Sequence, residues 1–281
     1  MNQAVKLMLE KYNCHSLQEH EQALREILQE IALVGLWRGK FFEKASFYGG
    51  TALRIFYHLD RFSEDLDFTL LTPNPQWTWD PFAKVIQEEL AAFGFDVTFL
   101  EKKKSSQTAV KSAFLKTSTL QELMKIGVHS DHLKGIHSET IIRIKVEIDT
   151  DPHFPYPNEQ KFLEQPTAIS IRCVNREYLF AGKMHAALFR AWKGRVKGRD
   201  WYDLVWFIRN KTPLSLSAFS KFLEKEISQE AFIKMAKERI EELDVPSAIQ
   251  DIANFVRDRE AIEKTWSKEF FTHWIQQLHY V

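Results

Sequence analysis

The sequence has few cysteines, no long apolar stretch and no net charge. Its two cysteines, Cys14 and Cys173, cannot build a zinc cluster and need not pair, which fits a reducing compartment. No run of roughly 18 or more apolar residues is present, so we expect no membrane-spanning helix and no membrane partner. The first residues lack the apolar segment of a secretory signal. We therefore predict a cytoplasmic protein.

The residues that are present suit a globular fold. The chain has 281 residues, 44% of them hydrophobic, with 22 Phe and 8 Trp, which is enough apolar surface for a core. Bases outnumber acids in residues 101–145 and 183–211, whereas residues 224–263 are rich in acids. Segregated charge of this kind gives either a basic surface that suits nucleic acid or ordinary solvated helix faces.

Apolar periodicity predicts an α+β fold. The spacing predicts a helix over 16–36, with Ser16 as its N-cap and Glu19 completing a capping box. Further helices are expected at 52–58 and 80–93, and strands at 66–71, 95–100, 108–116, 141–149 and 168–174. Only helices follow, at 176–193, 200–210, 217–226, 229–242, 245–262 and 266–279. We predict an α+β core domain over 1–175 and a helical domain over 176–281.

Two short motifs precede and follow the helix expected at 52–58. Gly49 and Gly50 open this helix, and paired glycines let backbone N–H groups approach a phosphate closely. Asp65 and Asp67 stand two residues apart at the start of a strand, so their carboxylates point the same way and can bind the same divalent cation. Each motif alone is common, but their order and spacing together are much more specific.

The strand expected at 141–149 supplies a third carboxylate. Its charged residues alternate with apolar ones and share one face. Glu147 is the candidate third metal ligand and Asp149 is its rival. A simple surface ion pair of Glu147 with Lys145 or Arg143 is the alternative. Two Mg²⁺ ions held by such carboxylates bridge a triphosphate and an attacking oxygen in nucleotidyl transfer.

These motifs resemble the AbiEii-type nucleotidyltransferase toxins of the DNA polymerase β-like superfamily. The resemblance begins with GGTALR at residues 49–54 and RFSEDLDF at 61–68. IKVEI at 144–148 resembles the family's intervening strand, and YLFAGKMHAA at 178–187 its lysine-bearing helix. RDWYDL at 199–204 resembles an Arg-Asp-x-Tyr-Asp-Leu motif. The first two stretches together correspond to the first motif of the family. Counted in this way, four motifs in the expected order imply a nucleotidyltransferase-fold core with a mixed sheet flanked by helices, followed by a helical domain.

The resemblance implies roles for the first motifs. Asp65 and Asp67 would bind Mg²⁺, or Mn²⁺ in its place, with Glu147 as the third ligand and a further catalytic acid. The residues that would hold the triphosphate are Gly49, Gly50 and Thr51.

For each of three further side chains near these motifs, the sequence allows two interpretations. Arg54 and Arg61 either bind phosphate or pair with the neighbouring acids Asp60 and Glu64. Ser63 either bonds a triphosphate oxygen or caps the turn before the first aspartate.

The resemblance also implies roles in the helical domain, which would contribute Lys183 and Asp200 to the cleft. Lys183 would bind the nucleotide phosphates and neutralise the leaving pyrophosphate. Asp200 would be the late catalytic acid, either as a general base or as an organiser of Lys183 and the acceptor. Tyr202 and Asp203 are expected to hold the helix pair in place. Gly182 stands directly before Lys183, where a residue that favours helices would be expected. Either close packing requires a glycine there or the helix begins later.

We therefore predict a nucleotidyltransferase that moves a nucleoside monophosphate from an NTP to an acceptor hydroxyl. By resemblance the acceptor is the 3′ end of a tRNA, the protein is the toxin of a toxin–antitoxin or phage-defence pair, and a cognate antitoxin is its partner. The basic stretches 102–104 and 193–199 suit an RNA backbone. The alternatives are transfer to a protein or small molecule, or a non-catalytic module that binds NTP or a partner.

Overall fold

The computed structural model describes residues 2–102, 108–128, 133, 136–189 and 196–281. The chain divides into two compact units. Unit 1 consists of Met1–His58 and Phe62–Cys173, and unit 2 of Leu59–Arg61 and Val174–Val281. The short segment Leu59–Arg61 thus belongs to unit 2 although both its neighbours in sequence belong to unit 1. The predicted division into an N-terminal and a C-terminal domain stays a prediction.

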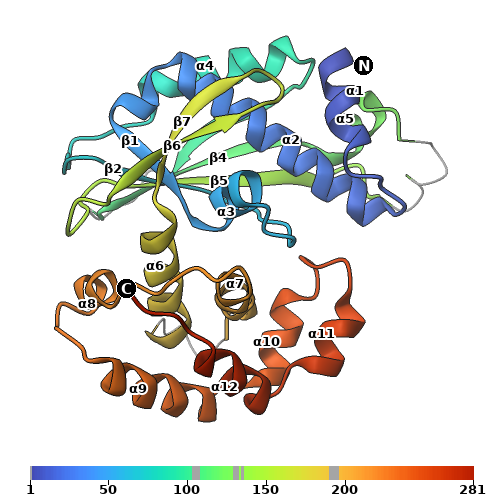
Figure 1. Ribbon diagram of the computed structural model, residues 1–281. Helices are drawn as coiled ribbons and strands as arrows, with labels where there is room; N and C mark the ends of the chain where they lie inside the picture. Colours follow the sequence, from blue (N-terminus) through green and yellow to red (C-terminus); the bar gives the residue numbers. More distant parts are fainter. Residues whose placement is uncertain (1, 103–107, 129–132, 134–135, 190–195) are drawn as a thin grey trace. The chain divides into compact units, whose positions relative to one another are not determined.

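Unit 1 combines a mixed sheet with helices (Figure 1). Its helices are α1 (Gln3–Glu10), α2 (Leu17–Arg38), α3 (Gly49–Tyr57), α4 (Asp80–Ala92) and α5 (Thr119–Lys125), with a short 3-10 helix at Phe41–Glu43. Its strands are β1 (Ala45–Tyr48), β2 (Leu66–Leu70), β3 (Thr98–Lys102), β4 (Val110–Ser118), β5 (Ile141–Asp149), β6 (Asn158–Leu163) and β7 (Ile169–Val174). The predicted mixed sheet flanked by helices is confirmed.

The seven strands follow the order β3-β4-β5-β2-β1-β7-β6. β2 runs antiparallel to β1 and parallel to β5, and β5 runs antiparallel to β4. β7 joins β1 in parallel where Cys173 lies opposite Phe47. The motif strand β2 is therefore an interior strand, and its register with β1 and β5 decides which side chains lie beside the aspartates.

Each face of the central strands has its own chemistry. On one face Phe47, Phe68 and Ile148 lie in one register row, are fully buried and belong to the core. The helix α2 packs onto this core through fully buried residues such as Leu24 and Ile31. The polar residues of the same strands lie on the opposite face, because successive side chains alternate.

Unit 2 contains helices, as predicted. They are α6 (Arg176–Phe189), α7 (Gly198–Arg209), α8 (Leu216–Leu223), α9 (Gln229–Glu241), α10 (Val245–Ile252), α11 (Arg259–Thr265) and α12 (Lys268–Gln276). The prediction of one helix over 245–262 is wrong, because a non-helical segment separates α10 from α11, where Asp258 caps the new helix. None of the helices in the described ranges is both long and apolar enough to cross a membrane.

Several predicted elements are confirmed closely. The helix α2 has the expected capping box between Ser16 and Glu19, and β5 spans the residues predicted from its alternation. The strands β3 and β4 begin two to three residues later than predicted. Two helices, α1 and α5, and two strands, β1 and β6, were not predicted from the sequence.

Candidate active site

The paired glycines lie where β1 ends and α3 begins. Gly49 has a φ of +84°, in the left-handed region that favours glycine. A Cβ on Gly49 would lie 2.6 Å from Oδ2 of Asp67, so only a glycine lets the backbone come this close to the carboxylate. The buried Thr51 donates a hydrogen bond from its hydroxyl to the carbonyl oxygen of Asp65. The glycine motif, which continues with the buried Gly50, is thereby joined to both aspartates.

Both aspartates occupy the predicted place at the start of a strand. Asp65 directly precedes β2 and Asp67 is its second residue. Each is half-buried, whereas Leu66 between them is fully buried. This alternation directs the two carboxylates to the polar face of the sheet, as the sequence predicts.

The register places Glu147 beside Asp67. Asp67 lies opposite Tyr48 on β1 and opposite Glu147 on β5. Asp149 lies opposite Thr69, two residues further along each strand. Adjacent strands are about 4.8 Å apart. Of the two rival carboxylates, Glu147 is therefore the direct neighbour of Asp67.

The carboxylate of Glu147 already has partners. Ser112 Oγ donates to Glu147 Oε1 at 2.7 Å, and Lys145 Nζ donates to Oε2 at 2.5 Å. The surface pair considered from the sequence is thus formed. Glu147 as a third metal ligand stays a prediction.

The aspartate pair fits a divalent cation in its donor chemistry. Hard cations such as Mg²⁺ take carboxylate oxygens, and two of these lie on one face with a glycine backbone against one of them. Within the described ranges, no group of three or more His, Cys, Asp or Glu side chains is arranged to hold a metal ion. The protein alone thus brings together two ligands, Asp65 and Asp67, and a Mg²⁺ ion with so few protein ligands keeps waters or substrate oxygens.

Two other predicted phosphate ligands have structural contacts. Arg54 Nε donates to Glu26 Oε2 at 2.8 Å, and its guanidinium lies 4.8 Å from the ring centroid of Phe62. The carbonyl oxygen of Ser63 accepts a hydrogen bond from Gln29 at 3.2 Å. Arg54 therefore pairs with Glu26, an acid that the sequence did not suggest as its partner. Nucleotide binding by Arg54 and Ser63 stays a prediction.

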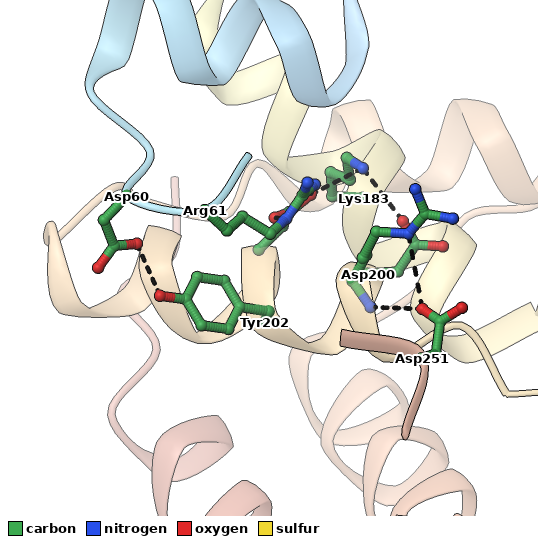
Figure 2. Close-up of polar contacts among 8 residues, drawn as sticks. Asp60, Arg61, Lys183, Asp200, Tyr202 and Asp251 are labelled. Carbon is green, nitrogen blue, oxygen red and sulfur yellow. Dashed lines mark hydrogen bonds and ion pairs between the residues drawn. The ribbon is translucent and has the colours of Figure 1, made fainter. Parts of the chain in front are cut away.

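In unit 2, four charged side chains form a cluster that we call the charged quartet: Arg61, Lys183, Asp200 and Asp203 (Figure 2). Lys183 Nζ on α6 lies 3.1 Å from Asp200 Oδ1 and 2.8 Å from Asp203 Oδ2, both on α7. Arg61 binds both oxygens of Asp203 at 2.6 Å, through Nε and Nη2. The quartet contains two cations and two anions and is neutral.

Burial makes this neutrality necessary. The exposed fractions of the side chains are 2% for Arg61, 16% for Lys183, 2% for Asp200 and 0% for Asp203. Burial by itself lowers the pKa of Lys183, but the charges of Asp203 and Asp200 outweigh it and raise the pKa above its ordinary value. The lysine is therefore held in its charged form.

Asp203 has more partners in the charged quartet than the sequence indicated. We expected it to hold the helix pair, and it does bind Lys183 from the neighbouring helix. It also binds Arg61, for which the sequence suggested Asp60 or Glu64. The spacing of Asp200 and Asp203 is a signal that could have indicated two carboxylates facing one lysine, because residues i and i+3 share a helix face. The pairing with Arg61 has no local signal.

Gly182 lies inside α6, which begins at Arg176, so a later helix start is wrong. A Cβ on Gly182 would lie 3.3 Å from the ring of Phe222, and close packing therefore accounts for the glycine. Neighbouring contacts fix α7 as well. Tyr202 donates to Asp60 at 2.7 Å, and the backbone N–H of Arg199 donates to Asp251 at 3.3 Å (Figure 2).

The basic stretches proposed for RNA lie largely outside the described residues. Lys103, Lys104, Lys193 and Arg195 belong to the undescribed segments 103–107 and 190–195. Arg199 is described, and it lies 3.6 Å from Asp251 through Nε and against the ring of Phe255.

Comparisons with known proteins agree with the motif resemblance. The family model for the nucleotidyl transferase AbiEii toxin of type IV toxin–antitoxin systems matches residues 31–271. The structure is similar to that of JHP933 from Helicobacter pylori, with a TM-score of 0.52 and 18% identity over 91% of this chain and 90% of the other. A putative nucleotidyltransferase from H. pylori gives a TM-score of 0.47 and 17% identity over 91% and 93%. No curated protein matches. At such identities the similarity to JHP933 concerns the fold alone.

Proposed function

Because the chain belongs to the AbiEii family of nucleotidyl transferase toxins of type IV toxin–antitoxin systems, we propose that it performs Mg²⁺-dependent transfer of a nucleoside monophosphate to the 3′ end of a tRNA. Its activity as a nucleotidyltransferase follows from the family. What we propose beyond the family is the identity of the metal, of the acceptor and of the residues that act.

The approach of Gly49 to Asp67 carries the proposal. A backbone that comes within contact distance of a carboxylate leaves no space for a side chain there, and it brings the N-terminus of α3 next to the aspartates. The N-terminal N–H groups of a helix favour phosphate oxygens. A triphosphate at Gly49, Gly50 and Thr51 therefore lies beside Asp65 and Asp67.

Each group has a defined task in the transfer. The acceptor hydroxyl oxygen forms a bond to the α-phosphorus of the NTP and gives up its proton to the surrounding water. The bond between that phosphorus and the oxygen that bridges it to the β-phosphorus breaks, and pyrophosphate leaves. Bound Mg²⁺ supplies positive charge to the phosphate oxygens. Asp65 and Asp67 would hold the cation. Glu147, the direct neighbour of Asp67 in the sheet, would be the third protein ligand.

Lys183 and Asp200 complete the assignment. Lys183 keeps its positive charge and neutralises charge on the leaving pyrophosphate. Asp200 accepts a hydrogen bond from Lys183, which favours its role as the organiser of that lysine over a role as general base. Arg54 and Ser63 are secondary phosphate ligands in this proposal.

The experiment supplies purified protein with total tRNA, Mg²⁺ and each labelled NTP in turn. We expect label on tRNA that is lost with Asp65→Asn, Asp67→Asn and Lys183→Ala and on removal of the divalent cation. Mn²⁺ tests replacement of the metal, and Asp149→Asn is the matched control for Glu147→Gln. Equal loss with both of these variants would contradict Glu147 as the specific third ligand.

Other acceptors give different results in the same assay. Label on protein, with acceptor binding that depends little on salt, would replace tRNA by a protein acceptor. Nucleotide binding without any product, in the wild type and in Asp67→Asn alike, would indicate a binding module. The family also implies an antitoxin partner. We expect co-expression of that protein to relieve growth arrest caused by this chain, whereas an Asp67→Asn chain causes no arrest.

A further inference from the structure

The proposed mechanism assigns no task to two members of the charged quartet, Arg61 and Asp203. Arg61 and Asp203 are as buried as any ion pair in the described residues, with exposed fractions of 2% and 0%. Their two hydrogen bonds of 2.6 Å form the bidentate arrangement that gives guanidinium–carboxylate pairs their geometric precision. An ion pair this deep is weak evidence for stability, because desolvation offsets most of its attraction. A different role for it therefore has to be considered.

The bonds of Lys183 indicate that role. Asp203 Oδ2 accepts from Arg61 Nη2 and also lies 2.8 Å from Lys183 Nζ, so one oxygen joins both cations. A lysine ammonium has three N–H donors. Asp200 and Asp203 engage two of them, and no further acceptor for the third is found among the described residues. The quartet thus leaves Lys183 with one donor in a fixed direction.

The charge balance gives Arg61 a task of its own. Without Arg61, Lys183 would face two carboxylates and the cluster would carry a net negative charge, which repels a polyphosphate. With Arg61, the cluster is neutral and Lys183 can respond to a phosphate. The bidentate hold of Arg61 on Asp203 also fixes the oxygen that positions the lysine.

We propose that Arg61 and Asp203 are positioning residues for Lys183, which fix the direction of its ammonium group and cancel the excess negative charge beside it. This inference rests on the proposed function in one respect, namely that Lys183 acts on the phosphates of the NTP. Neither Arg61 nor Asp203 contacts the substrate in this proposal.

The same segment provides a matched control. Asp60 and Arg61 are neighbours, and both bond to α7, Asp60 through Tyr202 and Arg61 through Asp203. Tyr202→Phe removes the first bond and leaves the quartet intact. An effect that comes from anchoring the segment Leu59–Arg61 would appear in Tyr202→Phe as well, whereas an effect on Lys183 would not.

Steady-state kinetics of the full chain with NTP and tRNA test the charge argument. We expect Arg61→Gln to raise KM for the NTP about 10-fold, which is the size of effect that the loss of one hydrogen bond to a charged group has. Asp203→Asn should lower kcat about 10-fold or more without raising KM, because it leaves the cluster positive but the lysine poorly held. The double variant is neutral again, and its KM should return toward the wild-type value.

A result in which Arg61→Gln and Asp203→Asn raise KM alike, with no recovery in the double variant, would overturn the proposal and leave an ordinary structural ion pair. So would a Tyr202→Phe variant with the same kinetics as Arg61→Gln. If the wild type transfers nothing, or Lys183→Ala is as active as the wild type, the proposed function fails instead.

A second measurement does not depend on activity. The acylation rate of Lys183 at fixed pH follows its fraction of neutral amine, and mass spectrometry of the peptides measures it against the exposed Lys84 as an internal reference. The charges that act on Lys183 are those of Asp203, Asp200 and Arg61; the acids raise its pKa and Arg61 lowers it. We expect faster acylation with Asp203→Asn and no acceleration with Arg61→Gln. Equal acceleration in both variants would show only a loosened structure.

Discussion

The two groups of acidic residues in this chain differ in how their charge is balanced. In unit 1, Asp65 and Asp67 are half-buried on the polar face of the sheet, with a glycine backbone against Asp67. In unit 2, Asp200 and Asp203 are almost fully buried, and each accepts hydrogen bonds from a cation of the chain itself. The first arrangement suits a cation that arrives with the substrate, whereas the second fixes a lysine that is already present.

Because the acids of unit 2 are buried and paired, we expect the largest loss of stability from a substitution of Asp203. Asp203→Ala leaves Arg61 and Lys183 as buried charges without their shared partner, and breaking a buried pair costs about 3–5 kcal/mol. Urea unfolding followed by circular dichroism measures the change. Asp251→Ala, whose carboxylate is 28% exposed and pairs with Arg199, should cost less than about 1 kcal/mol. Similar losses in the free energy of unfolding for Asp203→Ala and Asp251→Ala would contradict this difference between a buried and a partly exposed ion pair.

Gly49 should show the next largest effect. Gly49→Ala forces a non-glycine residue into the left-handed region and places its Cβ against Asp67, which we expect to cost about 1–3 kcal/mol. Gly94→Ala is the matched control, because Gly94 has a φ of +92° but a Cβ added to it would have no atom within 4 Å. The free energies of unfolding of the two variants separate contact from backbone strain. Equal losses would mean that the approach to Asp67 contributes nothing.

One half-buried acid of unit 1, Glu30, has too little positive charge around it. Burial, and then the charge of Glu26, raise the pKa of Glu30 on α2 from 4.5 to about 8. The folded state therefore holds a proton that the unfolded chain releases, and this stabilisation is full below pH 4.5 and lost as the pH rises to about 8. Above that pH, Glu30→Gln should unfold with a free energy higher by about 1 kcal/mol or more.

Urea titrations at pH 5 and at pH 8.5 measure this effect. Glu88→Gln on α4 is the matched control, because it makes the same substitution at an exposed side chain. A constant difference between Glu30→Gln and the wild type at both pH values would contradict the assignment.

Asp67 should show the smallest effect on stability and a large effect on function. Asp67→Asn keeps the shape of a half-buried side chain and removes a negative charge next to Glu147, so we expect a change within about 0.5 kcal/mol. Thermal unfolding and the tRNA-labelling assay, run on the same preparation, measure both quantities. A loss of stability as large as that of Asp203→Ala would place Asp67 in a structural network.

Local patterns predicted the elements and motifs whose signal lies within a few residues. The capping box of Ser16 and Glu19 and the alternation of β5 each depend on a short stretch, and both were predicted correctly. The strand β6 (Asn158–Leu163) was missed because its residues are mostly polar and partly exposed at the edge of the sheet, so no apolar alternation marks it. Helices α10 and α11 were merged because their apolar spacing continues while Asp258 starts a second helix.

The sequence likewise predicted only those parts of the candidate site whose residues stand close together along the chain. Gly49, Asp65 and Asp67 were found because they stand close together in sequence, and their proximity in space is confirmed. The bond between Arg61 and Asp203 joins residues 142 positions apart, and only the fold brings them together. A long-range ion pair leaves no mark on periodicity or spacing.

The two cysteines differ in reactivity because of where the fold places them. Cys173 is fully buried opposite Phe47, and burial raises the pKa of its thiol, whereas Cys14 is only half-buried. Since the thiolate is the reactive form, a maleimide will modify Cys14 first and Cys173 only when the sheet opens. Timed alkylation of Cys173 thus reports how often the sheet around this strand opens.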